Sequence, residues 1–198
     1  MFYRIADVIL HFVLLFIFRI RRTGVENIPL EGGVIVAYNH KSYWDPVMAG
    51  ATCPRKLRFM AKEELFKNPL FGSLIKALGA FPISRGRGDI GAIKGSLKIL
   101  KEGNTMLIFP EGKRSKDGQI GSVKPGVAAI AHRAKVPIVP ACISGDYKWL
   151  HKITVSYGEP VYLDFENKMT ADEMQSAADD IINRIKRMNE QNLLSEGK

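Results

Sequence analysis

A histidine and an aspartate, His40 and Asp45, lie five residues apart in a polar stretch that follows a short apolar run. A carboxylate that holds one imidazole nitrogen fixes the tautomer and leaves the other nitrogen available as a general base. The pair therefore corresponds to the Ser-His-Asp constellation of hydrolases without its serine. The spacing leaves a second interpretation open, in which Asp45 only caps a helix and His40 is an ordinary polar residue.

The spacing also predicts how the two side chains meet. Residues five apart lie about 140° around a regular helix, so His40 and Asp45 cannot share a helical face. Proline favours the first helical position and keeps the preceding residue out of the α region, so Asp45-Pro46 predicts that Asp45 is the N-cap of a helix. His40 then lies in the loop before that helix, from which its ring can fold back toward Asp45.

Two further polar loops each follow a predicted strand and are rich in arginine and glycine. One contains Arg85 and the other contains Glu111, Gly112 and Arg114. Arginines on such loops can approach a phosphate closely and bind it bidentately, and a neighbouring carboxylate can orient the guanidinium. The alternative to phosphate binding is that these two loops are charged surface segments that contact only water. The second loop fails the P-loop pattern because Leu107 stands where the first glycine is required.

These loops need a scaffold, and the chain from residue 24 onward alternates short β-branched runs with helical stretches. The predicted strands cover 34–37, 57–61, 81–83, 105–109, 137–143 and 153–157. The predicted helices cover 46–50, 69–78, 88–101, 126–135 and 171–189, the last with Thr170 as its N-cap. The pattern predicts an α/β fold, with a single mostly parallel or mixed sheet flanked by helices and the functional loops at the carboxyl ends of its strands.

The composition is that of a packed globular protein with an anionic partner. Of the 198 residues, 46% are hydrophobic and 25% are charged, which excludes a disordered, fibrous or polytopic membrane protein. The formal net charge of +9 favours nucleic acid, a phosphorylated small molecule or an anionic lipid surface as partner. Two cysteines and four scattered histidines predict a reduced, cytosol-facing protein without a metal site.

The amino terminus is very apolar and ends in arginines. No formal charge lies between Asp7 and Arg19 when the histidine there is neutral. A helix over residues 5–18 would be about 21 Å long, which is shorter than the ~30 Å hydrocarbon core of a bilayer. We therefore predict an amphipathic membrane-anchoring helix over residues 1–22 that lies in the interface, followed by one domain over 23–198. The alternative is a helix buried in the core.

Four sequence blocks, in order, resemble the glycerolipid acyltransferase family, and within it the bacterial members that acylate 1-acyl-glycerol 3-phosphate. The first block is NHxxxxD, the second ends in an apolar stretch and an arginine, the third is FPEGxRS with a lysine where threonine is common, and the fourth is an apolar strand with prolines. The blocks are Asn39 to Asp45, Gly79 to Arg85, Phe109 to Ser115 and Val136 to Pro140.

The resemblance implies a reaction in which a glycerol hydroxyl attacks an acyl thioester and releases a thiol. His40 would take the hydroxyl proton, and Asp45 would orient the ring and stabilise the imidazolium. The donor would be acyl-CoA or acyl-acyl carrier protein, with no other cofactor and no metal. The product would be phosphatidic acid, made at the cytoplasmic face of the cell membrane by a peripheral enzyme.

The resemblance also implies the residues that bind the acceptor, lysophosphatidic acid. Arg85 and Arg114, with Glu111 and Gly112 in the same block as Arg114, would hold its phosphate. Lys62 is a further candidate, because a stretch like the one around it often lies between the first two blocks of the family.

Alternatives to this function are an acyltransferase that uses glycerol 3-phosphate or another lysophospholipid, and a basic peripheral lipid-binding module without chemistry. A nucleic-acid-binding protein is disfavoured because neither a basic stripe with interleaved aromatics nor a glycine loop at the first helix is evident.

Overall fold

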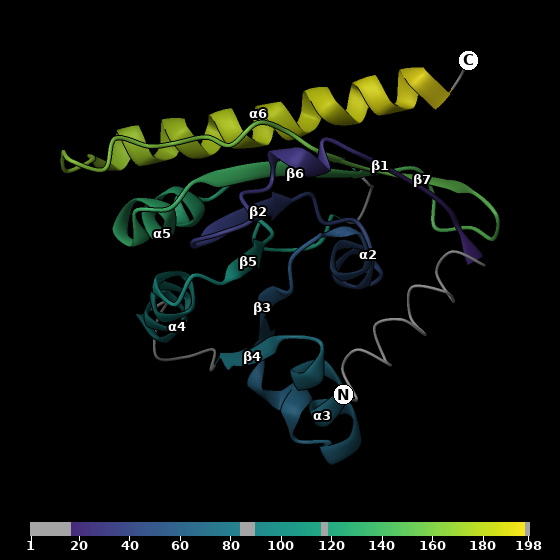
Figure 1. Ribbon diagram of the computed structural model, residues 1–198, viewed down its shortest axis with the longest axis horizontal. Helices are drawn as coiled ribbons and strands as arrows, with labels where there is room; N and C mark the ends of the chain where they lie inside the picture. Colours follow the sequence, from purple (N-terminus) through teal and green to yellow (C-terminus); the bar gives the residue numbers. More distant parts are fainter. Residues whose placement is uncertain (1–16, 84–89, 116–118, 197–198) are drawn as a thin grey trace.

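The structure is a computed structural model that describes residues 17–83, 90–115 and 119–196. Its strands form one mixed seven-stranded sheet in the order β1-β7-β6-β2-β5-β3-β4 (Figure 1). Strands β6, β2, β5, β3 and β4 run parallel to one another, whereas β7 is antiparallel to β6 and β1 is parallel to β7. The strands are β1 (Arg19–Thr23), β2 (Val34–Tyr38), β3 (Leu57–Lys62), β4 (Ala80–Ile83), β5 (Thr105–Ile108), β6 (Ile138–Ser144) and β7 (Lys152–Tyr157).

Helices cover both faces of the sheet. On one face α4, α5 and α6 pack against the sheet, with α6 lying along β6, and α2 packs on the other (Figure 1). Short 3₁₀ turns, η1 and η2, precede β2 and α3. The helical segments are η1 (Val25–Asn27), α2 (Asp45–Thr52), η2 (Glu63–Phe66), α3 (Pro69–Ala77), α4 (Ile90–Lys101), α5 (Gly126–Ala134) and α6 (Ala171–Glu196).

The central strand β2 shows why the sheet is predictable. All five of its residues are buried, as expected for a strand covered on both faces. Val34, Val36 and Tyr38 belong to the core cluster on the α2 side, and Ile35 and Ala37 to the cluster beneath α4, α5 and α6. The predicted α/β fold with a single mixed sheet is confirmed, and each predicted strand and helix from residue 34 onward has a counterpart.

Strand β1 was not predicted, and it changes the boundary assigned to the amino-terminal segment. Residues 19–22 belong to an edge strand that pairs in parallel with β7, so they are not the end of a helix. The predicted boundary after residue 22 therefore divides a strand. Residues 1–16 lie outside the described residues, and the anchoring helix stays a prediction for them. None of the helices in the described part of the chain is long and apolar enough to cross a bilayer.

The topology brings several polar loops to one edge of the sheet. Strands β6, β2 and β5 are neighbours that end at this edge, and β7 and β1 begin at it. We call it the carboxyl edge. The loops that follow β2 and β5 are the ones that contain the predicted catalytic and phosphate-binding residues, so the fold brings them together.

Candidate active site

His40 and Asp45 are in direct contact at the carboxyl edge. The Nδ1 atom of His40 lies 2.8 Å from Oδ2 of Asp45. The Asp45 side chain is fully buried, whereas 18% of the His40 side chain is exposed. An ionised carboxylate only accepts hydrogen bonds, so Nδ1 carries the proton and Nε2 is the free, basic nitrogen. The geometry is that of an oriented general base with access to solvent.

The Asp45 carboxylate is held by further donors besides the histidine. Its Oδ2 accepts hydrogen bonds of 2.6 Å from the backbone N–H groups of Lys41 and Ser42. Its Oδ1 accepts one of 2.8 Å from the hydroxyl of Tyr147. These bonds compensate the cost of burying the charge.

The predicted N-cap role of Asp45 is wrong. Helix α2 begins at Asp45 itself, and Trp44 is the residue before it. The carboxylate turns back to the N–H groups of the preceding loop instead of forward to those of the helix. It therefore stabilises the loop that carries His40, and not the amino terminus of α2.

Tyr147 is a site residue that the sequence analysis missed. It comes from the loop between β6 and β7, 102 residues after Asp45. Burial, together with the charge of Asp45 and the hydrogen bond to it, raises the pKa of Tyr147, so its hydroxyl stays protonated and donates. Only its position after a predicted strand at the carboxyl edge could have indicated it.

The His40 ring is also fixed by stacking. Its centroid lies 4.0 Å from that of Phe109, with 16° between the ring planes. The start of the loop is tied to β6 by Asn39, whose amide nitrogen donates to the Ile143 carbonyl and whose amide oxygen accepts from the Ile143 N–H. The His40 ring is thus oriented by a carboxylate at its edge and an aromatic ring on its face.

Glu111 connects the loops after β2 and β5. Its side chain is buried, and its two oxygens accept 2.9 Å hydrogen bonds from the backbone N–H groups of His40 and Gly121. The N–H of Ser115 also donates to the carbonyl oxygen of His40 at 2.8 Å. Both carboxylate oxygens of Glu111 thus bind backbone, whereas the sequence suggested that it orients an arginine. Gly112 takes the left-handed conformation (φ 69°) that this turn requires.

Arg114 lies beside this connection, over an aromatic ring. Its guanidinium carbon is 3.7 Å from the ring centroid of Tyr43, a cation–π contact. Arg114 also lines a cavity of about 340 Å³. The residues around that cavity are Glu111, Lys113, Arg114, Ser115, Gln119, Gly121 and Ser122. A cavity lined by Lys113 and Arg114 suits an anionic group.

The remaining predicted phosphate-binding residues are more distant or undescribed. Lys62 is the exposed last residue of β3, so it lies at the carboxyl edge but two strands away from β2. Arg85 lies outside the described residues. Among the residues that the structure describes, no three His, Cys, Asp or Glu side chains gather where they could hold a metal ion.

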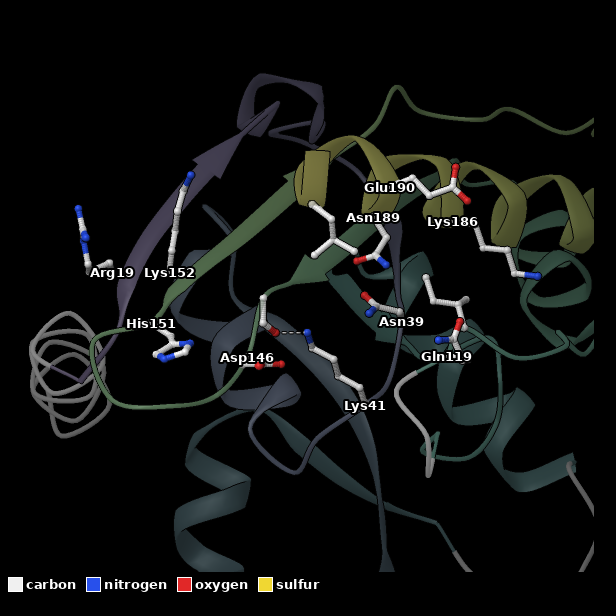
Figure 2. Close-up of a pocket in the computed structure, with 13 residues that line it drawn as sticks. Arg19, Asn39, Lys41, Gln119, Asp146, His151, Lys152, Lys186, Asn189 and Glu190 are labelled. Carbon is white, nitrogen blue, oxygen red and sulfur yellow. Dashed lines mark hydrogen bonds between the residues drawn. The ribbon is translucent and has the colours of Figure 1, made fainter. Parts of the chain in front are cut away.

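A larger cleft of about 970 Å³ opens on the α6 side of the same edge (Figure 2). Asn39 and Lys41, the two neighbours of His40, line it together with residues of β1, β7 and α6. The Lys41 ammonium donates to the carbonyl oxygen of Gly145, the contact dashed in Figure 2. The cleft therefore borders the loop that carries His40.

The site joins an α/β sheet to a histidine that is held by a buried carboxylate, beside a cavity lined by Lys113 and Arg114. The Acyltransferase family model matches residues 19–144, which is more than half of the chain, and the chain belongs to this family. The match includes β1 to β6 and both loops of the site.

Individual relatives agree with this assignment. The 1-acyl-sn-glycerol-3-phosphate acyltransferase of Streptococcus pneumoniae is 38% identical over 168 residues, which are 81% of this chain and 62% of that protein. The protein of the same name from Bacillus subtilis is 32% identical over 82% of this chain and 84% of its own length. The chain thus spans less than two thirds of the first relative.

A solved structure shows the same fold. The crystal structure of the 1-acyl-sn-glycerophosphate (LPA) acyltransferase PlsC from Thermotoga maritima superposes with a TM-score of 0.70 over 96% of this chain and 81% of that one, at 24% identity. The seven-stranded arrangement is therefore one that a solved structure also adopts.

Proposed function

We propose that this chain transfers an acyl group from a thioester to the free hydroxyl of 1-acyl-glycerol 3-phosphate, giving phosphatidic acid. The observation that carries the proposal is the 2.8 Å contact between His40 and Asp45 beside the Arg114 cavity. The names of the Streptococcus and Bacillus relatives support this acceptor.

The geometry supports direct transfer in two steps. The free Nε2 of His40 takes the proton of the hydroxyl as its oxygen bonds to the thioester carbonyl carbon, and Asp45 stabilises the imidazolium that forms. Collapse of the tetrahedral intermediate breaks the C–S bond, and the departing sulfur takes the proton from the imidazolium. A positioned general base contributes about 10² to 10⁴ in rate, and holding the two substrates together contributes more.

The cysteines are poorly suited to form an acyl-enzyme. Burial raises the pKa of the thiols of Cys53 and Cys142 to about 11, so both are protonated at neutral pH. A thiolate is the nucleophilic form of cysteine. This supports a mechanism in which the acceptor hydroxyl takes the place of the missing triad serine.

The acceptor phosphate is assigned to the cavity that Arg114 lines. The guanidinium is stacked on Tyr43, which restricts its position, and a guanidinium can contact a phosphate through two N–H groups at once. Ser115, the next residue, is hydrogen-bonded to the His40 backbone, so phosphate and base are held on one connected loop pair. Arg85 and Lys62 are further candidates for the same anion.

We assign the protein to the cytoplasmic face of the cell membrane as a peripheral protein. The apolar run before residue 17 would lie in the interface, and the net charge of +9 would favour an anionic lipid surface. Both substrates are then within reach, because the acceptor is a membrane lipid and the donor, acyl-CoA or acyl-acyl carrier protein, comes from the aqueous side.

The direct test is acceptor-dependent thiol release by the full chain. We expect lysophosphatidic acid with acyl-CoA or acyl-acyl carrier protein to give one thiol per phosphatidic acid, measured by a thiol reagent and by mass spectrometry. Glycerol 3-phosphate and other lysophospholipids form the comparison panel. Absence of acceptor-dependent release with both donors contradicts the function, and a burst of thiol without acceptor contradicts direct attack.

Replacing Arg114 by alanine should chiefly weaken acceptor binding. Loss of a hydrogen-bonded charge contact to phosphate predicts a rise in the acceptor KM of about tenfold to a hundredfold. The donor KM should stay unchanged, and Arg114→Lys should be intermediate because it keeps the charge without the bidentate fork. Arg133→Ala, on an exposed face of α5, is the matched control. An unchanged acceptor KM would place the phosphate elsewhere.

A further inference from the structure

Exposed apolar side chains gather on two loops at the carboxyl edge. In the loop between β6 and β7, Trp149 and Leu150 are 70% and 56% exposed. In the loop after β2, Tyr43 is 81% exposed and Trp44 is also exposed. We call these four side chains the edge patch. Single exposed apolar side chains are common on protein surfaces. Several of them gathered in one place indicate an interaction surface.

The two loops lie side by side. Phe18 packs edge-to-face against both Trp44 and Tyr147, at centroid distances of 6.3 and 5.6 Å. The N–H of Leu150 donates to the carbonyl oxygen of Ile17 at 2.7 Å. The described chain thus begins between the two loops, at Ile17 and Phe18.

One residue of the β6–β7 loop, close to the start of β7, has a strained backbone conformation. Leu150 has φ 59°, the left-handed region, which costs a bulky residue on the order of 1 kcal/mol or more. At the base of the loop Gly145 lies so close to the Lys152 carbonyl that a Cβ would collide with it. Because the Leu150 side chain is largely exposed, packing within the fold does little to compensate this strain. We therefore expect the side chain to contact a partner outside the protein.

Cations flank the edge patch. Arg19 and Lys152 are paired in register on β1 and β7, and their side chains extend side by side in Figure 2. Both line the 970 Å³ cleft together with His151. Lys148, next to Trp149, is exposed and has one acidic partner, Asp146, at 3.4 Å. The patch is therefore apolar at its centre and basic at its rim.

The structure assigns the edge patch to an anionic lipid bilayer, with Trp149 and Leu150 in the boundary between headgroups and acyl chains and Arg19 and Lys152 at lipid phosphates. Aromatic side chains with a basic rim are the composition of interfacial membrane contacts. Ile17 lies at this edge, and the sequence that precedes it is very apolar, which favours a bilayer over a protein partner.

This contact would place the reacting base at the membrane surface. Tyr147 joins the β6–β7 loop to Asp45, so the dyad is hydrogen-bonded to the loop that carries Trp149 and Leu150. An amphiphilic acceptor could then reach His40 without leaving the bilayer. Only this consequence rests on the proposed function, because docking itself is measured without substrates.

Tryptophan fluorescence tests insertion directly. The chain has two tryptophans, so Trp44→Phe leaves Trp149 as the sole reporter in the full chain. On vesicles of equal parts phosphatidylcholine and phosphatidylglycerol, we expect a blue-shifted emission that lipids with brominated acyl chains quench. An emission that is unshifted and unquenched while the protein sediments with the vesicles would overturn the proposal.

A second measurement compares partitioning of variants that melt at the wild-type temperature. Replacing both Trp149 and Leu150 by serine should weaken partitioning to these vesicles about tenfold or more. Leu30→Ser is the matched control, since Leu30 is 77% exposed in the loop before β2, at the opposite edge of the sheet. Equal loss in the control, or no loss in the double variant, contradicts docking by the edge patch.

Charge reversal tests the basic rim. Replacing both Arg19 and Lys152 by glutamate should remove most of the preference for vesicles with phosphatidylglycerol over phosphatidylcholine alone. The matched control replaces Lys98 and Lys101, at the far end of α4, by glutamate and should keep that preference.

A solution assay separates docking from catalysis. The variant with serine at both Trp149 and Leu150 should keep wild-type kcat with a short-chain lysophosphatidic acid in monomeric solution. Normal solution activity with normal vesicle binding would refute the docking surface and leave the proposed function standing.

Discussion

The His40→Ala variant is expected to lose acyl transfer by about 10² to 10⁴ in kcat, because the acceptor hydroxyl then has no positioned base to take its proton. The fold should persist, since the ring is partly exposed and its main contacts are the Asp45 carboxylate and the face of Phe109. Thiol release at saturating donor and acceptor measures the loss, and a thermal melt confirms that the variant is folded.

A second histidine provides the control for this experiment. His132 lies on α5, where its Nε2 contacts the carbonyl oxygen of Asn167, away from the carboxyl edge. His132→Ala should keep wild-type turnover. Substantial turnover in a folded His40→Ala variant would remove His40 from the role of base, whatever the identity of the acceptor.

The core strands were predictable because their signal is local. Residues 34–37 and 105–109 are short β-branched and apolar runs bounded by polar loops, which a strand buried on both faces produces. Long α6 was predicted from its amphipathic pattern and from Thr170, whose hydroxyl and N–H exchange hydrogen bonds with Glu173 in a capping box. Such signals depend only on neighbours in the chain.

Strand β1 was not predictable in this way. Its three arginines give neither clear alternation nor an apolar run, and what makes it a strand is the free edge of β7, which lies 133 residues later in the chain. Charged side chains are typical of an edge strand because they discourage pairing with another molecule. The same arginines also resemble the end of an interfacial helix, and only the long-range pairing distinguishes the two.

Part of the site follows from the sequence and part follows only from the fold. The contact of His40 with Asp45 was expected, because a loop of five residues already limits where the two side chains can lie. The direction of the carboxylate was not, since donors from the loop and from Tyr147 compete with the helix N-terminus. The use of Glu111 as a bridge between loops likewise depends on tertiary contacts.

The Asp45→Asn variant should show the second large effect, a loss of kcat of about 10³ to 10⁴, as the same replacement gives in Ser-His-Asp triads. An amide can still accept the hydrogen bonds of the Lys41 and Ser42 N–H groups through its oxygen, so the loop should keep its shape. It has no negative charge to stabilise an imidazolium, and its NH₂ group takes the place of the oxygen that accepts from the Tyr147 hydroxyl. Steady-state kinetics in both substrates should therefore show a fall in kcat with little change in either KM.

Two further variants separate the role of the carboxylate from that of its surroundings. Tyr147→Phe removes one of the donors to Asp45 and leaves the charge in place, so it should cost only about tenfold in kcat, the low end for the loss of one hydrogen bond to a charged group. Asp146→Asn changes the adjacent, exposed carboxylate, which pairs with Lys148, and should leave turnover unchanged. If Tyr147→Phe were as damaging as Asp45→Asn, orientation of the buried side chain, and not its charge, would account for catalysis by this dyad.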